Sequence, residues 1–130
     1  MSLLLWCLLI AGVLPILAKA PVVYFQNRDN GYDNKHPRAQ QQRLLGRGAR
    51  AVAGHYNAYE AFPLFAAAIL AAIATSQVTE RIEFLSVSFI VLRVLYHIAY
   101  LSNYDKLRSL IWFLATLCPV LILAQVALSV

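Results

Sequence analysis

The sequence predicts an all-α integral membrane protein whose single domain, residues 1–130, is a bundle of four transmembrane helices. Hydrophobic residues make up 61% of the chain and charged residues 13%, and the mean hydropathy is +0.64. Soluble domains carry about 25% charged residues, so this chain has too few charges to cover a water-facing surface. Its apolar residues also form four stretches of the length that crosses a bilayer as a helix, about 20 residues. Four β-strands are too few to close a barrel, which leaves helices.

The four helices are expected at about residues 3–25, 49–76, 84–104 and 109–130. The first contains Lys19 and the kink-prone Pro15. We expect it to be a permanent helix and not a signal peptide, since no basic residue precedes it and no clean cleavage site follows it. The fourth carries no charged residue over its whole length. A polar loop rich in turn-forming residues, at about 26–43, joins the first two helices.

The distribution of basic residues predicts which loops face the cytoplasm. Seven of the eleven Lys and Arg residues lie in the loop between the first two helices or in the helix ends next to it: Lys19, Arg28, Lys35, Arg38, Arg43, Arg47 and Arg50. Lys106 and Arg108 lie in the third loop, whereas Arg81 in the second loop is flanked by glutamates. Because basic loops stay cytoplasmic, we expect both termini of this multi-pass protein on the non-cytoplasmic side. The compact loops and the lack of a targeting peptide favour a bacterial inner membrane.

Charge and cysteine content also limit the partners. The net charge of +5 is concentrated in one segment and not spread along a folded face, so no nucleic-acid partner is expected. The basic loop is expected to face lipid headgroups or, alternatively, to attract an anionic ligand to the cytoplasmic mouth. Cys7 and Cys118 lie within apolar stretches and have neither metal-ligand nor disulfide spacing. We therefore expect two buried thiols and no bound metal.

Polar residues inside the predicted spans are the candidates for function. Glu60 and Arg93 are ionisable, and such residues in a span usually face a bundle interior or a wet cavity. Asn57 precedes Glu60 by three residues and so shares its helix face. The third helix carries a stripe with spacings of three, four and four residues: Arg93, Tyr96, Tyr100 and Tyr104. With Arg108, these stripes are expected to converge on a cavity open to the cytoplasm.

Two interpretations of these stripes fit the sequence. In the first, Glu60 and Arg93 form an interhelical ion pair that only fixes packing. In the second, which the nearby amide, phenol and imidazole groups favour, the stripes form a ligand site. His97 points off the stripe and is expected to be a packing residue. Such a pocket suits a small polar zwitterion beside an apolar substrate, and Arg and hydroxyl donors stabilise a thiolate.

At these residues the chain resembles the MAPEG family, the membrane-associated proteins of eicosanoid and glutathione metabolism. The segment Asn57-x-x-Glu60-x-x-Pro63-Leu64-Phe65 is similar to the corresponding segment of leukotriene C synthase. The segment from Arg93 to Leu101, followed by Leu107-Arg108-Ser109, is similar to microsomal prostaglandin E synthase. The resemblance covers effectively the whole chain and implies a MAPEG-like four-helix subunit.

The resemblance also implies a homotrimer in contact with membrane lipids, with glutathione bound between neighbouring subunits. The residues that would hold glutathione are Asn57, Glu60, Arg93, Tyr96 and Tyr100, to which we add Tyr104 as the end of the same stripe. Arg108, aided by Ser109, would stabilise the glutathione thiolate as the catalytic group. Glutathione-using members commonly carry an arginine four residues before the asparagine, where this chain has Ala53. Arg50 and His55 are expected to supply the missing contact.

The expected function is a glutathione-dependent membrane transferase, or a peroxidase, that directs the thiol at a hydrophobic small-molecule substrate. The alternative is a non-catalytic protein of the same fold that binds a lipid or scaffolds a partner. The absence of an arginine at Ala53 favours this alternative. The two hypotheses differ in whether glutathione binds.

Overall fold

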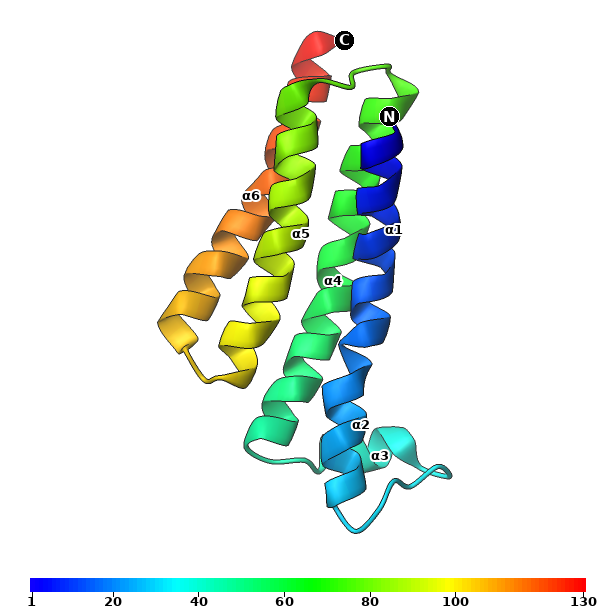
Figure 1. Cartoon of the computed structure of the whole chain (residues 1–130), viewed down its shortest axis with the longest axis vertical. Helices are drawn as coiled ribbons and strands as arrows, with labels where there is room; N and C mark the ends of the chain where they lie inside the picture. The colour runs from blue at the N-terminus through cyan, green and yellow to red at the C-terminus, as the bar shows by residue number, and fades with distance from the viewer.

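The computed structural model describes all 130 residues and contains helices but no strands. Its helices are α1 (Ser2–Leu17), α2 (Lys19–Arg28), α3 (Pro37–Gln42), α4 (Arg47–Ala74), α5 (Glu80–Leu101) and α6 (Asp105–Ser129). Four spans are long and apolar enough to cross a membrane: α1 with α2, then α4, α5 and α6. The spans form one elongated bundle with both termini at the same end (Figure 1). The predicted four-helix membrane bundle is confirmed.

The first span, Ser2–Arg28, is interrupted at the single residue Ala18, whereas we expected a continuous span with any kink at Pro15. α1 ends at Leu17, and α2 begins two residues later, after Ala18. Pro21 lacks the N–H that would bond to the carbonyl of Leu17, and its ring crowds that carbonyl. The break therefore follows from Pro21, and Pro15 lies inside α1 without ending it.

The third span begins earlier than hydropathy predicted. α5 starts at Glu80 and not near residue 84, because the Thr79 side chain accepts a hydrogen bond from the N–H of Ile82 and caps the helix. Glu80 and Glu83 in the first turn are favourable near the positive end of the helix dipole. Capping and dipole effects outweigh the polarity of this segment, which had led us to place it in a loop.

The turn between α5 and α6 removes Tyr104 from the predicted stripe. α5 ends at Leu101, and Asn103 then adopts a φ of +63°, which reverses the chain direction. α6 consequently begins at Asp105, four residues before the predicted start. Tyr104 is the N-cap residue of α6 and not part of α5, so its expected place on the polar stripe is wrong.

The basic loop contains more ordered structure than the turns that we expected. α2 extends into it to Arg28, and α3 lies beside α2 at this end of the bundle (Figure 1). The buried Gln40 of α3 organises the intervening turn, and its Oε1 accepts from the N–H of Asp33 at 2.9 Å. Its amide nitrogen lies 2.8–3.2 Å from the carbonyl oxygens of Gln26, Asp29 and Gly31.

The apolar core occupies the half of the bundle nearer the termini. A single cluster of 13 buried residues draws on α1, α4, α5 and α6. Within it, Phe65 of α4 stacks on Phe89 of α5, with ring centroids 4.1 Å apart and planes inclined by 6°. Cys7 and Cys118 belong to this cluster and are free thiols, so their predicted burial is confirmed.

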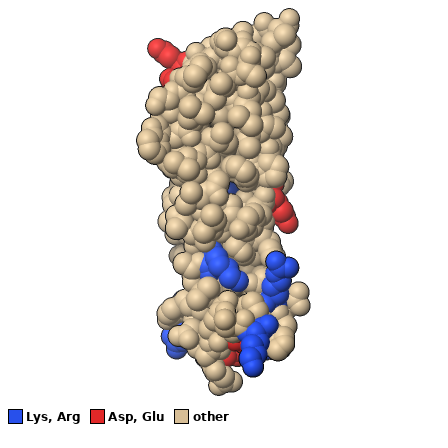
Figure 2. All heavy atoms as spheres, turned by 90° about the vertical axis from the view of Figure 1, so that its right-hand side faces the viewer, with Lys and Arg blue, Asp and Glu red and all other residues tan.

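Basic side chains gather at the opposite end of the bundle. Figure 2 shows the Lys and Arg side chains of one face toward the end formed by α2 and α3, while the far end of that face is free of them. The turn between α5 and α6 lies at this same end (Figure 1). The first and third loops therefore lie on one side of the bundle, as the sequence predicted.

Candidate functional site

Two neighbouring openings lie where α4, α5 and α6 meet. The first has a volume of about 180 Å³, and its polar lining includes Asn57, Glu60, Arg93 and Thr116. The second has a volume of about 240 Å³ and is lined by Asn57, Tyr96, Tyr100, Arg108, Ser109 and Trp112. Asn57 and Trp112 line both. Seven of the ten predicted site residues thus lie at one composite site, which we call the α4–α6 site.

Arg93 is the buried centre of the α4–α6 site. The residue is only 3% exposed, and its Nη2 donates a hydrogen bond to Oδ1 of Asn57 at 2.7 Å. Its guanidinium also lies 4.4 Å from the centroid of the Tyr96 ring. An amide oxygen and an aromatic face both offer negative potential to the cation, which offsets the cost of burying it. Arg93 is therefore fixed by α4 on one side and by its own helix on the other.

Glu60 and Arg93 do not form the direct ion pair that we considered. Salt bridges occur only at the N-terminus and within the first loop. Asn57 stands between the two charged groups, since its Nδ2 lies 3.5 Å from Oε2 of Glu60 while its Oδ1 accepts from Arg93. Glu60 is exposed, so its carboxylate remains open to a cationic group.

Arg108 and Tyr100 form the outer part of the site. The Arg108 guanidinium of α6 lies 4.5 Å from the centroid of the Tyr100 ring of α5. Tyr100 packs edge-on against Tyr96, at 5.6 Å between centroids. Ser109 lines the same opening, and its hydroxyl donates to the carbonyl of Asp105 at 3.1 Å. The adjacent rings of Tyr96 and Tyr100 thus connect the two arginines of the site, Arg93 and Arg108.

Trp112 is a site residue that the sequence analysis missed. It lies four residues after Arg108, on the same face of α6, and lines both openings. The spacing from Arg108 was the available signal, but the sequence analysis noted only that the fourth helix carries no charged residue. Its indole provides the apolar wall beside the charged groups of the site.

Three predicted site residues lie elsewhere. Arg50 lines a separate cavity on the other side of α5, together with His97. His55 faces α1, where its Nδ1 donates to the carbonyl of Pro15 at 2.9 Å. Tyr104 is 63% exposed and lines neither opening of the α4–α6 site.

The fold and the site together define an integral membrane protein of the four-span helical class, with a cationic and aromatic site at the junction of three helices. The sequence model of the MAPEG family matches residues 3–128, so the chain belongs to the MAPEG family. No curated protein and no solved structure matches the chain. The family includes glutathione transferases as well as non-catalytic members.

Proposed function

We propose that the protein is a glutathione-dependent transferase that conjugates glutathione to hydrophobic electrophiles from the membrane. The observation that carries this proposal is the convergence of Arg93, Arg108, Asn57 and Glu60 on one site between α4, α5 and α6. Two guanidinium groups and one open carboxylate in an otherwise apolar protein suit a zwitterionic ligand with an excess of negative charge.

The side chains of the site match the functional groups of glutathione. Arg93 and Arg108 suit its carboxylates and its thiolate, while the exposed Glu60 suits its ammonium group. Asn57 and the tyrosine hydroxyls suit its amides. When bound, glutathione supplies the nucleophilic thiol. Arg108 holds a positive charge at the outer part of the site, where it would lower the pKa of a thiol placed beside it.

We further propose that the protein works as a homotrimer with both termini on the non-cytoplasmic side. Glu60 lies midway along α4 and is exposed, as are Tyr56 and Tyr59 on the same helix. A carboxylate that faces hydrocarbon is costly, so a neighbouring subunit is expected to cover this face. The basic end of the bundle would then lie in the cytoplasm.

The direct test is conjugation of an aryl halide by Arg108→Ala. Loss of one charged group that stabilises a developing anion typically lowers turnover by about 100-fold or more. Lys106→Ala is the matched control, since Lys106 is an exposed cation two residues earlier that lines neither opening. Unchanged turnover in Arg108→Ala would refute the catalytic assignment.

A second candidate is a non-catalytic member of the family that binds a lipid. Its support is that glutathione-using members carry an arginine at the position of Ala53, whereas Arg50 lines a different cavity of this subunit. A glutathione titration of the thermal unfolding midpoint separates the two candidates, because a ligand that binds the native state raises that midpoint. A saturable rise with reduced glutathione supports the transferase, and no rise at millimolar concentration supports the second candidate.

A further inference from the structure

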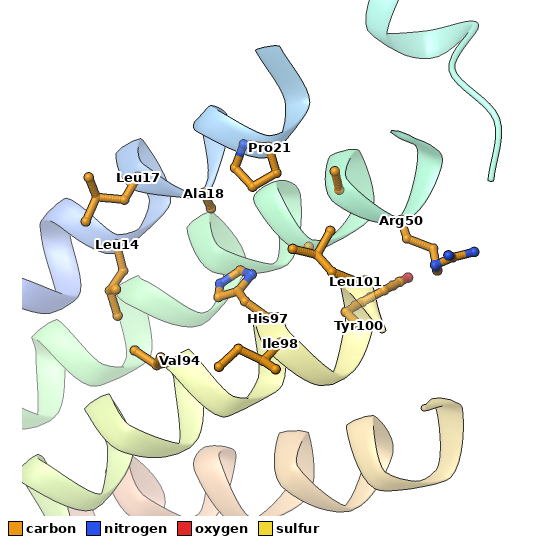
Figure 3. Close-up of a pocket in the computed structure, with 12 residues that line it drawn as sticks. Leu14, Leu17, Ala18, Pro21, Arg50, Val94, His97, Ile98, Tyr100 and Leu101 are labelled. Atoms are coloured by element: carbon orange, nitrogen blue, oxygen red, sulfur yellow. The ribbon is translucent and has the colours of Figure 1, made fainter. Parts of the chain in front are cut away.

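A second cavity lies on the side of α5 that faces away from the α4–α6 site. It has a volume of about 210 Å³ and is enclosed by the break between α1 and α2, the first turns of α4 and the last turns of α5. Figure 3 shows aliphatic side chains of α1 and α5 around one part of this space, and Arg50 and Tyr100 at another. Of its 12 lining residues, eight are hydrophobic and none is acidic.

Two buried nitrogen atoms of this cavity lining have no hydrogen-bond partner: Nε of Arg50 and Nε2 of His97. Buried polar atoms without a partner are rare, because each has lost its hydrogen bonds to water without gaining a replacement. The Nε of arginine can only donate, so the group that it lacks is an acceptor. No group of this subunit accepts from the Nε of Arg50, and the cavity lining contains no acidic side chain, so we expect a ligand to supply the acceptor.

Polarity changes along the length of this cavity. Arg50 lies in the first turn of α4 and Tyr100 in the last turn of α5, both at the basic end of the bundle. Val94 precedes Tyr100 by six residues, which places it about 9 Å deeper in the span. Leu14 of α1 lines the same deeper part. The cavity thus offers a cation at headgroup level and an aliphatic surface below it.

We propose that this cavity binds a fatty acid from the surrounding membrane, with its carboxylate at Arg50 and its chain along Leu14 and Val94. A cavity of about 150 Å³ holds one benzene molecule, so about 210 Å³ accommodates part of one acyl chain and not two. A single-chain acid therefore fits better than a two-chain phospholipid. Arg50 and His97 lie outside the α4–α6 site, and Tyr100 is the one residue that lines both this cavity and that site. The fatty acid would therefore occupy a different cavity from glutathione.

The test compares three amphiphiles that have the same hydrocarbon chain length and differ only in the headgroup. The full-length protein in phosphatidylcholine nanodiscs is titrated with dodecanoate, dodecanol and dodecyltrimethylammonium without glutathione, and the thermal unfolding midpoint is measured. We expect a saturable rise with dodecanoate and at least about tenfold weaker binding of the other two. Equal shifts for all three, or none for dodecanoate, would overturn the proposal. Because glutathione is absent, either result leaves the transferase proposal intact.

Two pairs of variants locate the binding. Arg50→Gln should weaken dodecanoate binding by about tenfold or more, whereas Arg47→Gln, on the same helix but outside the cavity, should not. Ile98→Trp should obstruct the cavity, while Val91→Trp, two turns earlier on the same face of α5, should leave binding unchanged. Ile98 and Val91 are both more than half exposed, so the tryptophans are expected to be tolerated. If both Arg50→Gln and Ile98→Trp bind dodecanoate with full affinity, the fatty acid does not bind in this cavity.

Discussion

The two halves of the bundle differ in how completely they are packed. In the half nearer the termini, Phe65, Ile69 and Ile82 have no exposed surface and form one continuous core. In the half nearer the first and third loops, Arg93 and His97 lie between the helices, and cavities open on both sides of α5. Aliphatic and aromatic side chains can fill all the space between helices, whereas polar side chains also need partners. The first half stabilises the fold, and the second provides room for ligands.

The largest effect is expected from Phe65→Ala, in the packed half. The change removes a fully buried ring that stacks on Phe89, and the loss of packing should lower the free energy of unfolding by about 3–5 kcal/mol. Equilibrium unfolding in mixed detergent micelles measures this. Phe84→Ala is the control, because Phe84 is 71% exposed and its loss should cost little. Equal effects of the two variants would show that the packed half is not the source of stability.

Arg93→Gln tests the polar half and should have the next largest effect. The variant removes the cation on the Tyr96 ring and the charged hydrogen bond to Asn57, at a cost of about 2 kcal/mol in the free energy of unfolding. It should also abolish the stabilisation of the protein by glutathione. The exposed Arg81 of the same helix provides the control Arg81→Gln, for which neither change is expected. If Arg93→Gln is less stable but still binds glutathione fully, Arg93 contributes to packing and not to glutathione binding.

A smaller and local effect is expected from Gln40→Ala in α3. Its amide holds the turn between α2 and α3, so the variant should expose that turn while the free energy of unfolding falls by about 1 kcal/mol. Hydrogen exchange of the backbone amides in the first loop should accelerate, and exchange in α5 should not change. Gln42→Ala in the same short helix is the control, since Gln42 is exposed. Unchanged exchange in the loop would show that Gln40 does not organise it.

The smallest effect concerns pH and is confined to the same loop. The backbone N–H of His36 and, less strongly, that of Lys35 donate to Asp33 and hold the pKa of its carboxyl below the usual 3.8. A lowered native-state pKa means that this stabilisation is complete above pH 3.8 and is lost as the pH falls through the lower value. NMR shifts of the Lys35 and His36 amides should report this transition, which Asp33→Asn should abolish. A transition at or above pH 3.8 would contradict the assignment.

Composition and local pattern were sufficient for the architecture. Four apolar stretches predicted four spans, and the burial of Cys7 and Cys118 followed from the stretches that contain them. The spacing of Arg93, Tyr96 and Tyr100 placed them on one face of α5, because helix geometry fixes which residues share a face. These features depend on residues close together in the sequence. They were therefore predictable without knowing how the helices pack.

Tertiary structure decided which of the polar faces meet. Arg50 and Asn57 are seven residues apart on α4, but the crossing of α5 separates them into different cavities. Asn57 separates Glu60 from Arg93, and the turn at Asn103 removes Tyr104 from the stripe. The sequence by itself determined the four membrane spans and the residues on each helix face, because hydropathy and helical periodicity are local. The tertiary structure decided the α4–α6 site and the cavity at Arg50, because the rotation and crossing of packed helices depend on contacts between distant segments.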